Sequence, residues 1–286
     1  SCDGVSSLSS GSNGGISQLI EGQNCQALAF GTSDAKPVTL SFYAKSSGTN
    51  SGHTYGIMLG AFLNGTRNIQ TRGFTVTSSW QRFIMTFQPN SLVTSTGIND
   101  DNNNGIQVFF SLAAGSSDLQ NYSVWTNSQS LSGFTGQDNF FDNTSNQFFL
   151  TGVQLEVGQN ATTFEHEPVE RTLAKCQRYT YRINSNSSDD TMIGAGYHKT
   201  TTTFRAIVHF PVTMRSGPTV TTNDADLTLL RDTTSDDSVT LGSSLDESEF
   251  SCGLNISGVT STAVGEGGIL RLDTTTTGFM QFDAEL

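Results

Sequence analysis

The sequence predicts an all-β protein with two domains, and its composition is the first observation behind that prediction. Gly (29 residues), Ser, Thr and Asn are abundant, only 14% of the residues are charged, and helix-favouring runs of Ala, Leu, Glu and Lys are few. Apolar residues instead alternate with polar ones in many short segments separated by polar turns, as expected for strands. The 286 residues are enough for two domains of ordinary size, each with its own core.

Four alternating sets predict strands in the first half of the chain. Alternation at period two places the apolar members of each set on one face of a sheet, as a sandwich core requires. The sets are Val38, Leu40, Phe42 and Ala44; Ile57, Leu59 and Ala61; Phe83, Met85 and Phe87; and Ile106, Val108, Phe110 and Leu112. Residues 1–15, rich in Gly, Ser and Asn, are expected to form a flexible lead-in, and Trp80 is expected in the core.

A boundary between the two domains is predicted after one further strand. Gly158 ends that strand, and Pro168 suits the first turn of a helix because the amide hydrogen it lacks would be unpaired there. Val169, Leu173 and Cys176 follow at helical spacing, which predicts a short helix with a buried apolar stripe. The preceding strand is expected to place five residues on one face: Phe149, Thr151, Val153, Leu155 and Val157.

Beyond the helix, the chain again has the pattern of short strands. The longest alternating run there is Phe204, Ala206, Val208, Phe210 and Val212, and further strands are expected at 179–183, 219–221, 227–230, 239–241, 250–256, 269–272 and 279–286. The predicted organisation is therefore a β-domain at 16–166, a linking helix at 167–178 and a smaller β-sandwich at 179–286. For Glu165, His166 and Glu167, at the junction, we expect helix capping and interdomain hydrogen bonding rather than catalysis.

The boundary segment closely resembles a junction found in tail fibres and related appendage proteins of tailed bacteriophages. The matching phrases are Gly152-Val-Gln-Leu-Glu156, Ala161-Thr-Thr-Phe-Glu-His166 and Leu173-Ala-Lys-Cys-Gln-Arg-Tyr179. Others, at Leu19-Ile-Glu-Gly-Gln23, Val38-Thr-Leu-Ser-Phe-Tyr-Ala-Lys45 and Ser79-Trp-Gln-Arg-Phe83, extend the resemblance over residues 16–181. The resemblance implies a jelly-roll β-sandwich, similar to carbohydrate-binding modules, then the short linking helix and a second, smaller β-sandwich.

Charge and cysteine content restrict the partners that we expect. The formal net charge is −12, and residues 183–286 hold 14 Asp and Glu against 5 Lys and Arg. An acidic surface repels phosphate groups, so binding to nucleic acid or to an anionic membrane is not expected. No apolar run approaches the ~18 residues that span a bilayer, so we expect a soluble protein without membrane insertion. Cys176 is expected to be a small buried residue, and a disulfide between Cys2 and Cys25 is left open.

Residues 100–105, Asp-Asp-Asn-Asn-Asn-Gly, match the first half of a calcium-binding loop. The oxygen ligands would be Asp100, Asn102 and Asn104. The glutamate that such a loop needs six positions after its glycine is absent, because Ser111 stands there, and Asn, Asp and Gly also dominate ordinary turns. The carbohydrate-binding modules that the first domain resembles often hold structural calcium. We therefore expect no cofactor other than a structural calcium ion, and its site remains open.

The segment 115–146 shows no alternation and is predicted to be a long aromatic loop. Tyr122, Trp125 and Phe134 offer faces on which the C–H groups of a pyranose can stack, and Asn121 offers an amide beside them. Long loops of this kind usually bind a ligand or pack over a sheet. These four residues are the candidate glycan site, and the alternative is that the aromatics cover the sandwich core or a subunit interface.

No motif of a catalytic site is present, so we expect a protein that is not an enzyme. The resemblance implies a structural protein of the virion, assembled in the bacterial cytoplasm as a tail fibre or similar appendage that attaches to a host-surface glycan or receptor. Its expected partners are other tail subunits, and fibres imply a homotrimer. Two alternatives stay open: a tailspike glycan depolymerase, which would present a cleft with two carboxylates, and a capsid decoration protein that binds no glycan.

Overall fold

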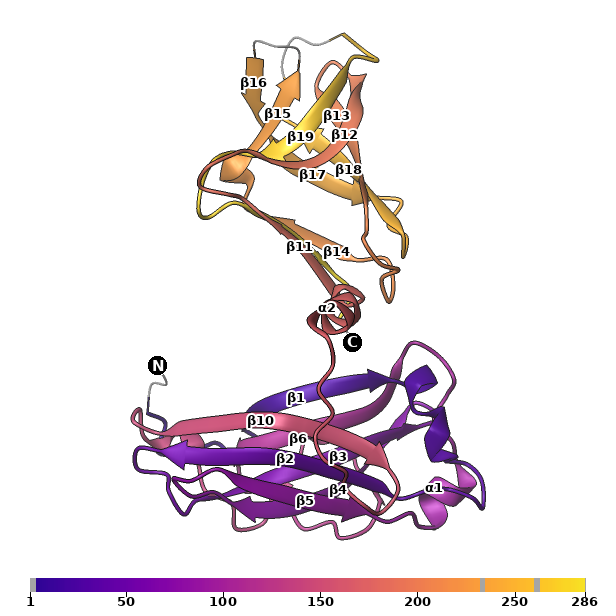
Figure 1. The fold of residues 1–286 in the computed structure, drawn as a ribbon, viewed down its shortest axis with the longest axis vertical. Coiled ribbons are helices and arrows are strands. Elements are labelled where there is room, and N and C mark those ends of the chain that lie inside the picture. Colours follow the sequence, from indigo (N-terminus) through magenta and orange to yellow (C-terminus); the bar gives the residue numbers. More distant parts are fainter. Residues whose placement is uncertain (1–3, 232–234, 260–262, 286) are drawn as a thin grey trace. The chain divides into compact units, whose positions relative to one another are not determined.

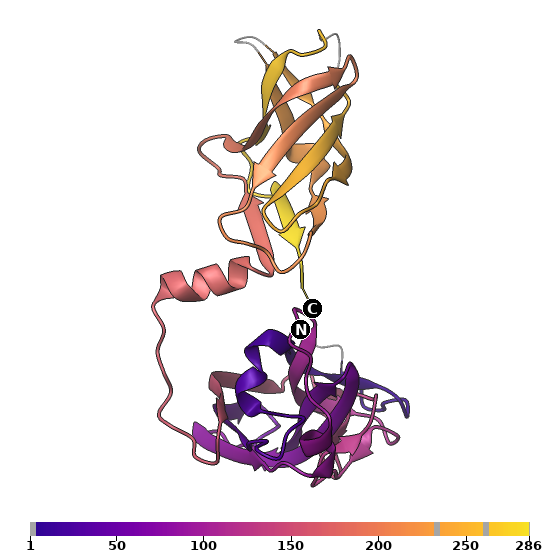
Figure 2. The ribbon, with the colours of Figure 1, turned by 90° about the vertical axis from the view of Figure 1, so that its right-hand side faces the viewer.

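Strands dominate the computed structural model of this chain, which describes residues 4–231, 235–259 and 263–285. They account for 48% of the residues and helices for 9%, so the prediction of an all-β sandwich protein is confirmed. The chain divides into two units: the first ends at His166, and the second runs from Glu167 to Glu285. Figures 1 and 2 show the strands of each unit. Each unit has its own hydrophobic core.

The first unit is a sandwich of two antiparallel sheets, with strand orders β1-β6-β3-β4-β8 and β10-β2-β5. A short parallel pair, β7 and β9, lies in the segment predicted as a long loop. The strands are β1 (Asn13–Glu21), β2 (Val38–Ser47), β3 (Thr54–Leu63), β4 (Thr66–Thr75), β5 (Gln81–Phe87), β6 (Asn104–Ala114), β7 (Leu119–Gln120), β8 (Thr126–Asn127), β9 (Gly133–Phe134) and β10 (Gln147–Val157). The helical turns are η1 (Gly22–Asn24), η2 (Gln26–Leu28), α1 (Ser91–Ser95) and η3 (Phe140–Asp142).

The core of this unit lies between the two sheets. The four predicted alternating sets fall on β2, β3, β5 and β6, and their apolar members are buried there or packed against the buried residues. Phe42 lies at the centre, because its ring centroid is 5.1 Å from that of Phe74, 5.2 Å from that of Phe83 and 5.0 Å from that of Phe110. Such aromatic contacts add to the free energy gained from burying apolar area.

The start of the first unit differs from the predicted flexible lead-in at 1–15. Strand β1 begins at Asn13, and a register shift between Gly14 and Gly15 brings its backbone unusually close to β6. A Cβ atom at Gly15 would lie 2.0 Å from the carbonyl oxygen of Phe110, so only glycine fits there. Gly15, one of the glycines that suggested flexibility, therefore serves close strand packing.

The second unit begins with α2 (Val169–Gln177) and contains a seven-stranded sheet, β16-β15-β19-β12-β13-β18-β17, and a three-stranded sheet, β11-β20-β14. Its strands are β11 (Thr180–Asn184), β12 (Thr191–Thr200), β13 (Thr203–His209), β14 (Thr219–Thr222), β15 (Leu227–Arg231), β16 (Ser235–Ser238), β17 (Thr240–Leu245), β18 (Ser251–Ser257), β19 (Gly267–Leu272) and β20 (Phe279–Asp283), with a turn η4 (Asp224–Asp226). Phe204, Phe282 and Leu270 are among its fully buried side chains.

Two strands of this unit depart from the sequence prediction. Strand β13 ends at His209 rather than Val212, because Pro211 has no N–H to donate to a neighbouring strand. Strand β12, at the middle of the large sheet, was not predicted at all. Its glycines break the alternation, and at Gly196 a Cβ atom would lie 1.9 Å from the carbonyl oxygen of Arg205 on β13.

The helix α2 is where predicted, but its apolar stripe is not buried. Val169 is 77% exposed and Leu173 is 53% exposed. Cys176, predicted to be buried, is exposed and carries a free thiol. Pro168 is the N-cap, and no side chain caps the helix, so the expected capping by the acidic residues before it is wrong. Helical spacing predicted the helix correctly, but it does not by itself determine whether the apolar face is covered.

Candidate functional site

The outer face of the sheet β10-β2-β5 carries the most distinctive side chains of the first unit. Successive residues of β2 point alternately to the core and outward. Phe42 and Ala44 are buried in the core, so Tyr43 and Lys45 lie on the outer face of the sheet. On β5, the core positions Phe83 and Met85 leave Arg82 and Ile84 outward. The same period of two places Trp80, just before β5, on the outer face.

Trp80 is therefore not a core residue, contrary to the prediction, and its side chain is 47% exposed. The alternation of β5 contained the necessary signal, because position 80 has the parity of Arg82 and Ile84. Opposite it, Phe149 on β10 is 38% exposed and pairs in register with Lys45. The Lys45 ammonium lies 5.2 Å from the ring centre of Trp80 and 5.0 Å from that of Phe149. A cation between two aromatic rings is thus displayed at one end of this sheet face.

A β-bulge in β10 changes which residues share that face. Thr151 pairs with Tyr43, but Gln154 pairs with Ser41, so one extra residue is inserted between them at Gly152, which has a φ of 58°. The predicted single face for positions 149–157 is therefore wrong. After the bulge Gln154 and Glu156 face outward, together with Phe149 from before it.

This outer face holds the segment that leaves the first unit. After Gly158 (φ 118°) the chain crosses the sheet, and residues on all three strands bind its backbone or side chains. Thr39 of β2 donates to the carbonyl of Gly158 at 2.7 Å, and Arg82 of β5 donates to the carbonyl of Thr162. We call residues 158–166 the exit segment.

Thr162 is the centre of the polar contacts that hold the exit segment. Its hydroxyl donates to Glu156 Oε1 at 2.6 Å and accepts from Gln154 Nε2 at 2.9 Å, while its amide donates to Glu156 Oε2 at 3.1 Å. The side-chain oxygen Oε1 of Gln154 accepts a hydrogen bond from the backbone amide of Glu165 at 2.8 Å. The hydrogen bond from the Thr162 side chain is the main cause of a lowered pKa of the Glu156 carboxyl.

In the segment 115–146, the structure favours the alternative that the aromatics cover the sandwich core. Trp125 is 1% exposed and packs edge-on against Phe30, with ring centres 5.8 Å apart, so its face cannot stack on a sugar. Tyr122 is partly buried against Met58, Ile69 and Phe109 on the outer face of the five-stranded sheet. The loop thus covers a second apolar layer outside the sandwich. This outer layer was not predicted, because the alternation of β3 was assigned to the core through Ile57 and Leu59, and Met58 lies on the opposite face.

Phe134, another predicted sugar contact, lies over a pair of glycines. Gly56 and Gly73 face each other on β3 and β4. A Cβ atom at Gly73 would lie 2.5 Å from the Phe134 ring, and one at Gly56 would lie 2.8 Å from the Phe134 amide nitrogen. The glycines leave the flat space that the ring fills. Asn121 is exposed, so of the four predicted residues it is the one whose whole side chain is available, and an isolated amide does not make a sugar site.

The predicted calcium residues lie in a turn that supports η1. Asp101 accepts from the Asn103 amide at 3.0 Å, and the carbonyl oxygens of Asp101 and Asn103 accept from Gln23 and Gly22. Asp100 is exposed, and Asn104 begins β6 opposite Glu21, a fully buried carboxylate that accepts from Gln23 Nε2 at 2.6 Å. Among the described residues no group of three or more His, Cys, Asp or Glu side chains could hold a metal ion. Calcium binding by Asp100, Asn102 and Asn104 remains a prediction.

An apolar cavity of about 490 Å³ lies between the edge strands β1 and β10. Its lining consists of Ile16, Ser17, Gln18, Ile20, Val108, Phe110, Leu150, Val153 and Leu155. None of these side chains can act as an acid, a base or a nucleophile at neutral pH except the weakly reactive hydroxyl of Ser17. The cavity is therefore an opening of the sandwich core rather than a reaction site.

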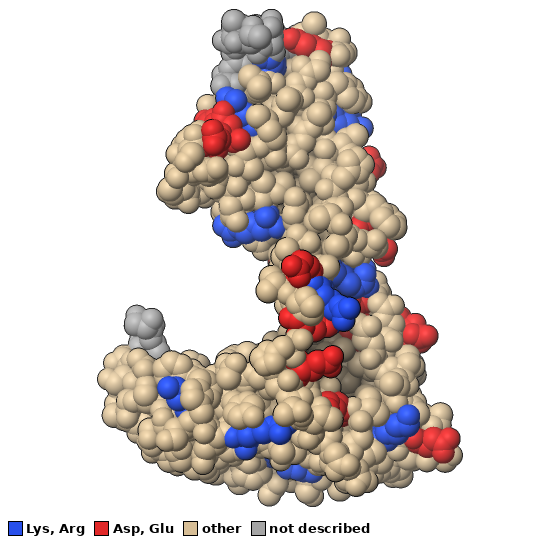
Figure 3. All heavy atoms as spheres, in the orientation of Figure 1, with Lys and Arg blue, Asp and Glu red and all other residues tan. Residues whose placement is uncertain are grey.

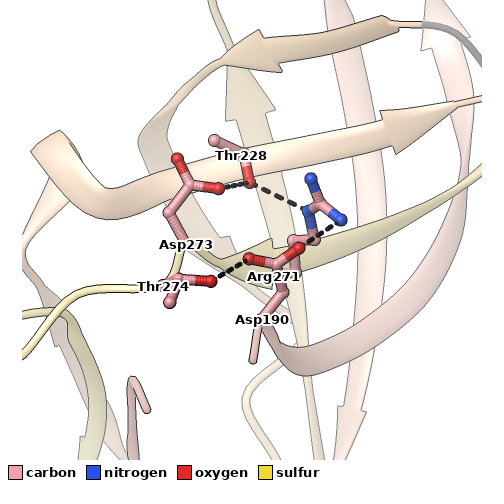
Figure 4. A network of polar contacts seen from close by, with 5 residues as sticks. All are labelled: Asp190, Thr228, Arg271, Asp273 and Thr274. Atoms are coloured by element: carbon pink, nitrogen blue, oxygen red, sulfur yellow. Dashed lines mark hydrogen bonds and ion pairs between the residues drawn. The ribbon is translucent and has the colours of Figure 1, made fainter. Parts of the chain in front are cut away.

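The second unit has a polar network at one end of its large sheet (Figure 4). Arg271 of β19 pairs with Asp190, Nη1 to Oδ2 being 2.6 Å, and its Nε donates to Thr228 of β15 at 3.2 Å. Thr228 donates to Asp273, and Thr274 donates to Asp190, both at 2.9 Å. Each acidic side chain in this network has a partner within it, which indicates a structural role.

Two of the described cysteines are buried in the cores and are not reactive centres. Cys25 and Cys252 are buried free thiols, and burial raises the pKa of each to about 11. Cys2, whose disulfide with Cys25 was left open, lies outside the described residues. In the first unit, basic and acidic side chains form small scattered patches on the mostly uncharged face that carries β10, β2 and β5 (Figure 3).

Comparison with known proteins does not assign this chain to a family. No family model matches it, and no curated protein matches it. Among solved structures, it is similar to a "putative secreted protein" from Parabacteroides distasonis, with 8% identity over 99% of this chain and 86% of that chain. The TM-score of 0.24 is too low for this similarity to carry an argument about fold or function.

Proposed function

We propose that this chain is a non-enzymatic structural protein of a phage tail fibre or similar virion appendage that takes part in attachment to a glycan of the host surface. The observation that carries the proposal is the set of hydrogen bonds that joins Gln154 and Glu156 to Thr162 and Glu165, which we call the polar clamp. The side chains of this clamp belong to the phrases of the sequence that resemble the phage junction, Gly152–Glu156 and Ala161–His166. The residues that carry the resemblance therefore act together, because they hold the exit segment on the sheet.

Holding the exit segment on the first unit suits a protein of a virion appendage. The exit segment is held along the sheet by hydrogen bonds from all three strands, so its backbone is fixed against the first unit. A module that transmits attachment to the rest of a particle needs such a defined exit. The outer face beside the clamp displays Trp80 and Phe149, and exposed aromatic rings are the groups on which sugars stack.

The partners and location follow from the same proposal. The chain would assemble in the bacterial cytoplasm into a homotrimer, join other tail subunits, and end in the virion. A net charge of −12 disfavours nucleic acid as a partner. None of the described helices is long and apolar enough to cross a membrane.

Labelling intact virions with antibodies raised against the purified chain tests this function. We expect the label at a tail appendage, and an excess of the purified protein should compete with virions for adsorption to host cells. Label on the capsid shell would favour a decoration protein instead. Release of reducing ends from host polysaccharide by the purified chain would identify a depolymerase and contradict the non-enzymatic proposal.

A further inference from the structure

We propose that Lys45, Trp80 and Phe149 form a binding site for an acidic sugar, one whose ring carries a carboxylate. This inference rests on the proposed function, because it names the glycan class and the residues that would contact it. It replaces the loop at 115–146, whose tryptophan is buried.

The three side chains are placed by rigid backbone. Lys45 and Phe149 are directly opposed on β2 and β10, and Ala44 pairs with Gln81, which fixes Trp80 on the other side of Lys45. Strand-borne groups keep their spacing when a ligand binds, which lowers the entropy lost on binding. The rings remain 47% and 38% exposed, although each has the Lys45 ammonium about 5 Å from its centre.

Charge selects the ligand. Residues 1–166 contain five of the 14 Lys and Arg residues: Lys36, Lys45, Arg67, Arg72 and Arg82. Arg67 and Arg72 are partly buried, and this burial lowers the pKa of each. Arg82 is engaged by the Thr162 carbonyl and lies over Tyr43. Among the described residues, no carboxylate lies within 4.0 Å of the Lys45 ammonium.

The half-buried Lys45 has no carboxylate partner among the described residues, so its ammonium can donate charge-assisted hydrogen bonds to an anion. The adjacent indole supplies a flat apolar face for the C–H groups of a pyranose. A sugar acid offers both features at once: a ring to stack on Trp80, and a carboxylate to accept hydrogen bonds from Lys45. Neutral sugars lack the second feature, and a small inorganic anion lacks the first.

Matched ligands and variants test this site by calorimetry on the full chain. The probes are tetragalacturonate and an α2,8-linked N-acetylneuraminic acid tetramer, each beside its methyl ester, which keeps the rings and removes the charge. We expect at least one of the two acids to bind more tightly than its own methyl ester, by about tenfold or more. A factor of this size corresponds to the loss of one charge-assisted hydrogen bond. Lys45→Met should abolish that difference, and Trp80→Ala should weaken binding of acid and ester alike.

Two control variants keep the test specific. Ile84→Ala changes an exposed residue on the same sheet face, and Lys36→Met removes an exposed lysine of the same unit, so both should bind like the wild type. Equal binding of acid and ester, unchanged binding by Lys45→Met, or no binding of either acid at about 10 mM would overturn the assignment. Inorganic phosphate competing as well as the sugar acid would show an anion site without sugar recognition and would overturn it too. Virion labelling is independent of these results, so failure here leaves the proposed function standing.

Discussion

Arg271 and Asp190 form an ion pair in the second unit, with 2.6 Å between Nη1 and Oδ2, and the two side chains are 12% and 28% exposed (Figure 4). Through Thr228 and Thr274 the pair also engages β15 and the loop after β19. The network therefore joins segments that are far apart in the sequence. A second ion pair of the same unit, Lys175 with Glu167, spans 2.5 Å but is 64% and 29% exposed. The two pairs offer a direct comparison of burial.

We predict that Arg271→Met destabilises the second unit by about 1–3 kcal/mol, because Asp190 loses a partner in a partly desolvated place. Lys175→Met is the control and should change stability by less than about 1 kcal/mol, since exposed ion pairs contribute little. Cys252 lies in the core of this unit and is 0% exposed, so its alkylation in increasing urea reports unfolding of that unit. Equal urea midpoints for the two variants would contradict the prediction.

The two tryptophans of the chain should respond oppositely to truncation. Trp125→Ala removes a buried ring and should destabilise the first unit by about 3–5 kcal/mol. Trp80→Ala removes an exposed ring and should cost less than about 1 kcal/mol, the size of an exposed cation–π contact. Each variant retains one tryptophan in the first unit, so its fluorescence follows unfolding of that unit. A large drop in melting temperature for Trp80→Ala would show that its ring supports the fold.

Thiol reactivity should separate the described cysteines. Burial raises the pKa of the Cys25 and Cys252 thiols to about 11, so at pH 8 they are protonated as well as inaccessible. Cys176 is exposed on α2. We expect iodoacetamide to modify Cys176 in the native protein and to reach the other two only after unfolding, as seen by peptide mass spectrometry. Rapid native modification of Cys25 would mean that the region around η1 opens readily.

Acid should loosen the exit segment. The pKa of Glu156 in the folded chain is below the ordinary value of 4.5, chiefly because of the Thr162 hydrogen bond. Its contribution to stability is therefore complete above 4.5 and is lost as the pH falls through the lowered folded pKa. In an NMR titration the Thr162 amide should shift with a midpoint below 4.5, and Glu156→Gln should remove that transition. A midpoint above 4.5 would contradict the clamp.

Much of the first unit was predictable from local sequence. Alternation identified β2, β3, β5 and β6 because each has one face against the core, and period two then fixes which residues are buried. Helical spacing likewise located α2. Strand β12 was missed because its glycines serve close contact with β13, and a glycine in a sequence does not reveal what approaches it.

The candidate site was predicted less well than the fold. Trp80 was expected in the core, and the structure places it at the surface. For Trp125 two alternatives stood open, a sugar contact or a cover for the core, and its burial agrees with the second. The parity of β5 could have placed Trp80 outward. Nothing near Trp125 in the sequence indicates that Phe30, some 95 positions earlier, packs against it; its ring centre lies 5.8 Å away.

The sequence by itself determined the all-β class, the alternating core positions and the helix between two β-rich regions, because these depend on the periodicity of the backbone. Tertiary structure decided which apolar faces are covered, where the β10 bulge turns Gln154 and Glu156 outward, and that Lys45 meets Trp80 and Phe149. The physical reason is that burial and pairing depend on partners distant in the chain, whereas the pattern along a strand specifies only the faces it offers.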